Sequence, residues 1–192
     1  MPNNLIVIGG TPGSGKTSVT SALAESLGVK AIQLGKLSEE KGCIKDFDKP
    51  RDTGIVDEDC LVEAIIDVID ARDDCLIIEG HYIDLVPSSE VKIAVILRTH
   101  PEILKTRLTK RNYSVDKIEE NVESEVFGVC QMDAIQAFGE DIVIEIDTSE
   151  VSVDDIVSTI IRNLDKMSQP LRFDWMSLLE EEGRLDDFVK NS

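Results

Sequence analysis

The residues best suited to chemistry lie near the start of the chain, in the segment Gly10-Thr11-Pro12-Gly13-Ser14-Gly15-Lys16-Thr17. This segment fits the pattern G-x-x-x-x-G-K-[ST], whose backbone N–H groups surround a phosphate. In that pattern the lysine, here Lys16, reaches the β- and γ-phosphates, and the hydroxyl, here of Thr17, holds Mg²⁺. The segment, called the phosphate loop below, therefore predicts a site for a nucleotide phosphate and its metal ion.

The residues on either side of the phosphate loop predict the elements that would position it. The apolar run Leu5-Ile6-Val7-Ile8 predicts a buried strand before the loop. Val19, Leu23 and Leu27 would share one face of a helix after the loop, and Gly28 would end that helix. The start of the helix adds its dipole and its unpaired N–H groups. An ordinary glycine-rich turn is the alternative, but it gives no reason for a Lys-Thr pair at this spacing.

A second group of polar residues, Glu79-Gly80-His81, follows the apolar run Cys75-Leu76-Ile77-Ile78. In phosphate-binding α/β proteins, such a strand often ends in a carboxylate that holds Mg²⁺ or its water. We expect Glu79 to hold the metal through a water molecule. His81 lies on the same side of an extended chain, where it could position a water or a phosphoryl acceptor. The alternatives are a carboxylate that caps a turn and a surface histidine.

Two arginines, Arg107 and Arg111, are four residues apart on a predicted helix, so both guanidinium groups would lie on one face. The helix would begin at Thr99-x-x-Glu102, with Pro101 at its first position. Arginine can bind phosphate through two hydrogen bonds and can stack on a flat base. Because the helix would leave a strand at the ligand-binding edge, these observations favour a phosphate clamp over a solvated helix face.

The order of apolar segments along the chain predicts an α/β fold with strands that alternate with helices. This order is typical of a doubly wound parallel sheet of five strands with helices on both faces, which binds ligands at the carboxyl ends of the strands. Residues 114–139 predict one long helix, capped by Ser114. Residues 35–56, a polar and irregular insertion, and residues 110–120 would open on that edge and could close over two substrates. The predicted strands are residues 5–8, 31–34, 75–78, 91–97 and 142–144.

Length and charge limit the function classes. The 192 residues suit a single domain. We expect a core at residues 1–167 and a C-terminal extension at residues 168–192, which holds the single tryptophan, Trp175, and packs on or near the core; a docking element for a partner is the alternative. The net charge of -18 opposes unspecific attraction to DNA. It would favour a basic protein partner, although solubility alone would also explain it.

The cysteines and the apolar runs indicate in which cellular compartment the protein is expected. No run of apolar residues is long enough for a membrane helix, and the N-terminus has no basic region before its short apolar run, so we expect a cytoplasmic protein without membrane association. The four cysteines form no C-x-x-C pair, which favours free thiols in a reducing cytosol over a zinc site. They are Cys43, Cys60, Cys75 and Cys130.

The order of these motifs resembles the nucleoside monophosphate kinases of the P-loop NTPase superfamily. It is most similar to the adenylate kinase isoenzyme six family, small adenylate kinases and NTPases of archaea and eukaryotes that are also known as small-ribosomal-subunit assembly factors. The likeness covers about residues 4–165. It is carried by the phosphate loop, Val56-Asp57-Glu58-Asp59, Val95-Ile96-Leu97-Arg98-Thr99, and Arg107-Leu108-x-x-Arg111-Asn112-Tyr113-Ser114 followed by Glu120-Asn121-Val122.

The resemblance implies phosphoryl transfer from ATP-Mg²⁺ to AMP, or to another nucleoside monophosphate, and a slow ATPase activity. It implies that residues 35–56 bind the monophosphate, that residues 110–120 form a lid, and that a basic small-subunit ribosomal protein is the partner. Catalytic roles are implied for Lys16, Glu79, His81 and Arg111, and metal binding for Thr17 and Glu79. The residues implied in binding ATP are Gly13, Gly15, Lys16, Thr17, Ser18, Arg107 and Arg111.

The chain departs from the family pattern at several positions. The family has Asp-x-His after its third strand, and Glu79 is one methylene longer than that aspartate. Asn112 replaces a glycine in the lid, which is tolerable where a left-handed residue is needed. Lys36 stands where an acid is often found. Ordinary adenylate kinases also carry an arginine that grips AMP after this strand, and residues 81–91 contain none, which predicts low kinase efficiency.

Two hypotheses of different kinds follow. The first is an enzyme, a monophosphate kinase with Lys16, Arg111 and Mg²⁺ stabilising charge on the transferred group. The second is a nucleotide-switched assembly factor that binds a ribosomal protein and phosphorylates AMP only incidentally. A small-metabolite kinase stays open, because the insertion does not reveal its acceptor. A GTP-binding switch is disfavoured, because the chain lacks an Asn-Lys-x-Asp guanine signature.

Overall fold

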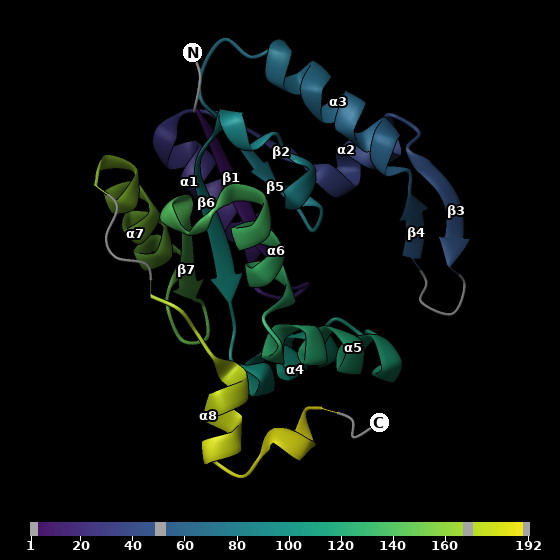
Figure 1. Ribbon diagram of the computed structural model, residues 1–192, viewed down its shortest axis with the longest axis vertical. Helices are drawn as coiled ribbons and strands as arrows, with labels where there is room; N and C mark the ends of the chain where they lie inside the picture. The colour runs from purple at the N-terminus through teal and green to yellow at the C-terminus, as the bar shows by residue number, and fades with distance from the viewer. Residues whose placement is uncertain (1–3, 49–52, 167–170, 190–192) are drawn as a thin grey trace.

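A five-stranded parallel sheet lies at the centre of the computed structural model, which describes residues 4–48, 53–166 and 171–189. The strand order is β2-β5-β1-β6-β7 (Figure 1), and every neighbouring pair is parallel. The predicted α/β fold with five parallel strands is therefore confirmed. The strands are β1 (Leu5–Gly10), β2 (Lys30–Gln33), β5 (Leu76–Glu79), β6 (Val91–Arg98) and β7 (Val143–Asp147).

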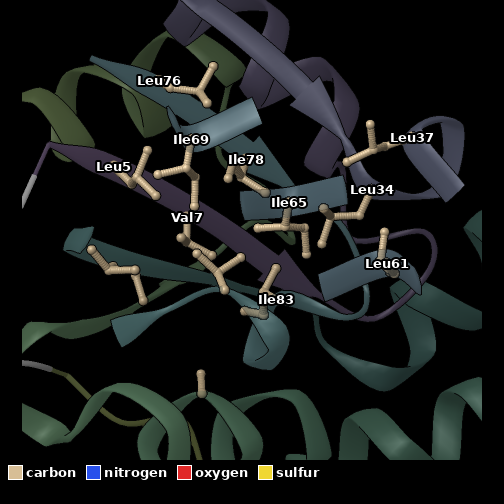
Figure 2. Close-up of a cluster of buried hydrophobic side chains, with 14 of the residues drawn as sticks. Leu5, Val7, Leu34, Leu37, Leu61, Ile65, Ile69, Leu76, Ile78 and Ile83 are labelled. Atoms are coloured by element: carbon tan, nitrogen blue, oxygen red, sulfur yellow. The ribbon is translucent and has the colours of Figure 1, made fainter. Parts of the chain in front are cut away.

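Helices cover both faces of the sheet because the central strands are apolar on both sides. In β1, Ile6 and Ile8 belong to a core shared with α1 (Lys16–Leu27) and α7 (Val153–Asp165). Leu5 and Val7 of the same strand belong to a second core. Figure 2 shows these two side chains near Ile65 and Ile69 of α3 (Glu58–Asp70), and α6 (Val129–Phe138) covers the same face.

Helix α4 (Pro101–Lys110) starts as predicted, but its cap is a different residue. The Nδ1 atom of His100 accepts a hydrogen bond from the backbone N–H of Glu102, at 3.3 Å. Thr99 is fully buried, and its hydroxyl lies 2.8 Å from that of Thr148. The predicted Thr99 cap is therefore wrong, because a buried hydroxyl partner just after the next strand competes for that side chain.

Residues 35–56 contain regular structure, so the predicted irregular insertion is corrected. Helix α2 (Leu34–Glu40) is followed by an antiparallel pair, β3 (Ile44–Asp48) and β4 (Thr53–Val56), in which Ile44 faces Val56 and Phe47 faces Gly54. The pair stands apart from the main sheet in Figure 1. Residues 49–52 of the insertion lie outside the described residues.

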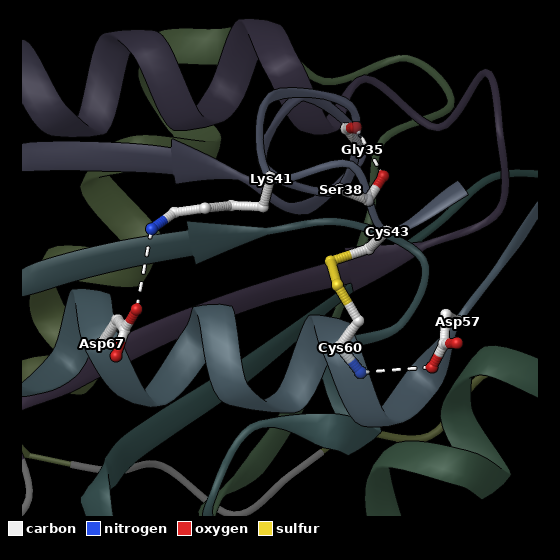
Figure 3. Close-up of a disulfide and its surroundings, with 7 residues drawn as sticks. All are labelled: Gly35, Ser38, Lys41, Cys43, Asp57, Cys60 and Asp67. Atoms are coloured by element: carbon white, nitrogen blue, oxygen red, sulfur yellow. Dashed lines mark hydrogen bonds and ion pairs between the residues drawn. A yellow bond between two sulfur atoms is a disulfide. The ribbon is translucent and has the colours of Figure 1, made fainter. Parts of the chain in front are cut away.

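A disulfide joins Cys43 to Cys60, and it overturns the prediction that these two thiols are free. Figure 3 shows the bond between the residue before β3 and the first turn of α3. The β3–β4 pair returns the chain to its starting point, where the backbone N–H of Asp57 donates to the carbonyl of Cys43 at 2.7 Å. The two cysteines meet through this hairpin, which the sequence did not predict. Cys75 and Cys130 are free, as expected.

Reducing the Cys43–Cys60 disulfide is expected to lower the free energy of unfolding by about 3 kcal/mol, because the bond closes a short loop in the unfolded chain. The measurement is urea unfolding with and without a phosphine reductant. The Cys75→Ser variant is the matched control and should respond to the reductant like the unaltered chain. A Cys43→Ser/Cys60→Ser variant as stable as the oxidised protein would contradict the prediction.

The predicted long helix over residues 114–139 is two helices, α5 (Val115–Val126) and α6. Ser114 caps α5 as predicted, but Gly128 adopts a left-handed conformation, with φ 66°, and breaks the helix there. Near the break, the backbone carbonyl of Glu125 accepts hydrogen bonds from the N–H of Gly128 at 3.1 Å and from Nη2 of Arg98 at 2.9 Å. The buried guanidinium of Arg98 therefore binds the C-terminal end of α5.

The C-terminal segment, residues 171–189, includes α8 (Trp175–Glu181) and lies beside α4 and α5 in Figure 1. Trp175 and Leu179 are buried, and the ring of Phe188 contacts the small apolar cluster between α4 and α5. Within the described ranges, no helix has both the length and the apolar character needed to cross a membrane.

Candidate active site

The phosphate loop connects the end of β1 to the start of α1, as predicted. Gly15 precedes α1 with φ 97°, a left-handed value that favours glycine. A Cβ atom on Gly10, whose φ is 135°, would lie only 2.5 Å from the carbonyl oxygen of Leu97 in β6. Because α1 begins at Lys16, its first N–H groups have no carbonyl within the helix and can bind an anion.

Lys16 is held against the phosphate loop by two backbone carbonyls. Its Nζ atom donates to the carbonyl of Gly10 at 2.7 Å and to that of Thr11 at 3.2 Å. Burial lowers the pKa of Lys16, while the nearby charges of Glu79 and Glu125 act in the opposite direction. An ammonium group with little hydration interacts strongly with an incoming phosphate.

Thr17 and Glu79 are brought together by the pairing of β1 with β5. The Thr17 hydroxyl donates to Oε1 of Glu79 at 3.0 Å, and the Glu79 side chain is 3% exposed. Its other oxygen, Oε2, is buried and has no hydrogen-bond partner among the described residues. Carboxylate and hydroxyl oxygens are the ligands that Mg²⁺ prefers, and a metal-bound water would satisfy the unpartnered oxygen. These residues therefore fit the expected metal ion.

His81 follows Glu79 at the same edge of the sheet. Loss of hydration lowers the pKa of His81, and the charge of Lys16 lowers it further, although Asp84 and Asp133 act in the opposite direction. The imidazole is therefore neutral at pH 7, and a neutral imidazole can accept a proton or a hydrogen bond from a water or acceptor. His81 is exposed, and its ring contacts that of Tyr82 with the ring centres 5.7 Å apart, so its role at the phosphate site stays a prediction.

Arg107 and Arg111 line one pocket of about 240 Å³ next to the phosphate loop, together with Gly13, Gly15 and Ser18. Arg107 is anchored by the loop after β7, because its Nη2 donates to the carbonyls of Thr148 at 2.6 Å and Ser149 at 3.2 Å. Arg111 is exposed and lies at the C-terminal end of α4. The structure thus brings the two arginines to one pocket with three of the predicted phosphate-binding residues, whereas Lys16 and Thr17 do not line that pocket.

The connection between α4 and α5 has the left-handed residue that the resemblance implied. Asn112 has φ 59°, the one positive value among the described residues other than glycine. Asparagine tolerates this conformation better than most side chains. The turn lets α5 pack back on α4, with Ile118 and Val122 buried against the apolar face of α4.

Two residues that contact the phosphate loop, Thr148 and Glu125, were missed in the sequence. The Thr148 hydroxyl donates to the backbone carbonyl of Ser14 at 2.9 Å, which supports the phosphate loop from behind. The Thr11 hydroxyl donates to Glu125 of α5 at 2.5 Å. The position of Thr148 just after a parallel strand was a usable signal, because such strand ends share one edge. Glu125 carried no such signal, because it lies within a helix 114 residues from Thr11.

Comparison with known proteins identifies relatives that match most of the chain, including the phosphate loop. A family model described as an AAA domain matches residues 6–128. An adenylate kinase isoenzyme 6 homolog of Caenorhabditis elegans is 37% identical over 141 residues, which cover 73% of this chain and 78% of the relative. A putative adenylate kinase of Pyrococcus abyssi is 38% identical over 157 residues, which cover 82% of each chain.

Solved structures show the same fold at lower identity. Shikimate kinase from Acinetobacter baumannii in complex with shikimate matches with a TM-score of 0.63 at 17% identity, covering 86% of this chain and 96% of that one. A sugar kinase from Janibacter sp. matches with a TM-score of 0.61 at 18% identity, covering 89% of this chain and 100% of that one. At these identities the likeness concerns the fold alone.

Proposed function

This chain belongs to the adenylate kinase family of the isoenzyme 6 homolog and the putative adenylate kinases, and we propose that it transfers the γ-phosphoryl group of ATP to AMP or a related nucleoside monophosphate. The observation that carries the proposal is the contact of Thr17 with buried Glu79 beside the phosphate loop. In the reaction, the bond between the γ-phosphorus and the β–γ bridging oxygen breaks, and a bond to a phosphate oxygen of AMP forms. The products are two molecules of ADP.

Each site residue has a proposed role. The backbone of Gly13 and Gly15, with Ser18, binds the ATP phosphates, and Lys16 neutralises charge on the transferred group. Thr17 and Glu79 would hold Mg²⁺, Glu79 through a water molecule, and the metal would supply neutralisation of the phosphate charge. The proposed clamp on the phosphates and the base consists of Arg107 and Arg111.

His81 and two further segments complete the proposal. His81, neutral at pH 7, positions the acceptor or a water molecule. Within a kinase core of residues 1–167, residues 35–56 bind the monophosphate and residues 110–120 close as a lid that excludes water. In the alternative reaction, water replaces AMP as the phosphoryl acceptor, which would make the protein a slow ATPase.

A role in small-ribosomal-subunit assembly is the second candidate, and the acidic charge favours it. A net charge of -18 would attract a basic ribosomal protein, and nucleotide binding would then change the affinity for that partner. For either candidate, the proposed location is the cytoplasm. Disulfides there are usually transient, so both proposed activities should be measured with and without reductant.

The deciding experiment is ADP formation from ATP-Mg²⁺ by the purified chain, with and without AMP and with and without a basic small-subunit ribosomal protein. We expect ADP formation to depend on AMP and to fall in the His81→Ala variant but not in Lys30→Ala, an exposed lysine of β2. Slow hydrolysis that ignores AMP and responds to the ribosomal protein would favour the assembly factor. No turnover in any mixture would sink both activities.

A further inference from the structure

A buried carboxylate on α5, that of Glu125, connects the phosphate loop to the C-terminal segment. We propose that Glu125 is a positioning residue, which holds Thr11 so that Lys16 stands in place for ATP, and which makes docking of Trp175 part of the same arrangement. The inference rests on the proposed function only in taking the phosphate loop as the ATP site.

Both oxygens of the Glu125 carboxylate are used, and the side chain is 1% exposed. Oε2 accepts a hydrogen bond from the Thr11 hydroxyl at 2.5 Å. Oε1 accepts from three donors in different parts of the fold, and each of them fixes the carboxylate from another direction. These donors are Nε of Arg98 at 2.8 Å, the backbone N–H of Thr99 at 3.0 Å and Nε1 of Trp175 at 3.1 Å.

Thr11 passes this restraint on to Lys16. The backbone carbonyl of Thr11 accepts hydrogen bonds from Nζ of Lys16 at 3.2 Å and from the N–H of Ser14 at 3.1 Å. The hydroxyl held by Glu125 and the carbonyl that holds Lys16 belong to one residue. If the backbone of Thr11 rotated, both the turn of the loop and the ammonium group of Lys16 would therefore be displaced.

The chain contains a matched comparison that separates this role from simple charge balance. Glu145 of β7 is also a buried partner of Arg98, with its Oε2 2.8 Å from Nη1. It also binds the C-terminal segment, because it accepts from the N–H of Phe173 at 3.1 Å and from Arg172 at 3.3 Å. Among the described residues, the hydrogen bonds of Glu145 reach Arg98, Arg172 and Phe173 and no residue of the phosphate loop, whereas Glu125 binds Thr11.

The experiment measures the affinity for a fluorescent N-methylanthraniloyl derivative of ATP, with Mg²⁺, and the KM values for ATP and for AMP. Thr11→Val, which removes only the hydroxyl, is expected to raise the Kd and the KM for ATP about tenfold, because it breaks a hydrogen bond to a buried charge. The KM for AMP should stay within about twofold, and Thr11→Ser should restore the ATP values. Glu125→Gln should resemble Thr11→Val, and Glu145→Gln should not.

The fluorescence of Trp175 tests the positioning role of Glu125 directly, because a purely structural role would not make that fluorescence respond to ATP. Its fluorescence should change when unlabelled ATP-Mg²⁺ binds, and this change should be lost in Thr11→Val while thermal unfolding stays cooperative. If Glu125→Gln does not fold, the Thr11 variants decide the question alone. Two results would overturn the inference: a Kd for ATP that is unchanged in Thr11→Val, or an equal rise of that Kd in Glu125→Gln and Glu145→Gln. Because ATP binding is measured directly, a failure of AMP phosphorylation would leave it standing.

Discussion

Replacing Lys16 with methionine is expected to lower kcat/KM for ATP by about a thousandfold, the usual cost of removing one preorganised charged donor from a site that stabilises developing charge. Lys16 already lies against the phosphate loop, held by the carbonyls of Gly10 and Thr11. Methionine keeps the length of the side chain and removes the charge. The measurement is steady-state ADP formation with saturating acceptor.

The fold should survive this substitution. Burial lowers the pKa of Lys16, which means that the folded protein pays to keep the ammonium charged, so an apolar side chain there should not reduce the melting temperature. Lys30→Met, on the exposed part of β2, is the control and should keep full activity. Activity in Lys16→Met within tenfold of the unaltered chain would show that the phosphate loop does not act as proposed.

Replacing Arg98 with methionine is expected to lower the free energy of unfolding by about 4 kcal/mol, because it removes the guanidinium that two buried carboxylates share. Arg98 is 1% exposed and forms ion pairs with Glu125 and Glu145, both at 2.8 Å. Its guanidinium also donates to the side chain of Gln131 and to the carbonyl of Phe173. Urea unfolding at pH 8 measures the effect.

The loss caused by Arg98→Met should depend on pH. Burial raises the pKa of Glu145 in the folded protein, and the charges of Arg98 and Arg172 oppose that shift. Without Arg98 the folded-state pKa rises further above the unfolded value, so the folded state binds more protons in the window between them. Stability then increases as the pH falls toward that pKa, and the deficit of the variant should be smaller at pH 5 than at pH 8.

An exposed arginine provides the control for this prediction. Arg184 also forms ion pairs, with Glu102 at 3.2 Å and with Glu182 at 3.5 Å, but it lies at the surface. Ion pairs in water contribute little, so Arg184→Met should leave the unfolding midpoint unchanged at both pH values. An Arg98→Met variant that unfolds at the same urea concentration as Arg184→Met would contradict the buried network.

Parts of the site that are continuous in sequence could be predicted without the structure. The phosphate loop, the helix after it and the strand before it are specified by adjacent residues, and all three appear where expected. The meeting of Thr17 with Glu79 could also be anticipated, because parallel strands end at one edge of the sheet. Local rules were sufficient wherever one pattern decided the outcome.

Features that depend on distant partners could not be predicted in this way. The Thr99 cap failed because Thr148, just after β7, contacts its hydroxyl. The carbonyl of Glu125, near the break at Gly128, is bound by the guanidinium of Arg98 from β6, and no local pattern indicates that contact. The Cys43–Cys60 bond requires a hairpin whose strands have little of the alternation that usually marks one, and only its pairing brings the two sulfurs together.

The position of β1 in the sheet has a consequence for folding of the nascent chain during translation. β1 lies between β5 and β6, and the strand that follows it in the chain, β2, pairs with β5 instead. β1 is synthesised first, but its neighbour β5 is complete only when residue 79 has been added. At ordinary rates of translation this takes roughly 3 to 14 seconds after β1. During that time the apolar residues Leu5 to Ile8 have no sheet to join. A nascent chain of this design is most vulnerable to wrong association at the strand that leads into its phosphate loop.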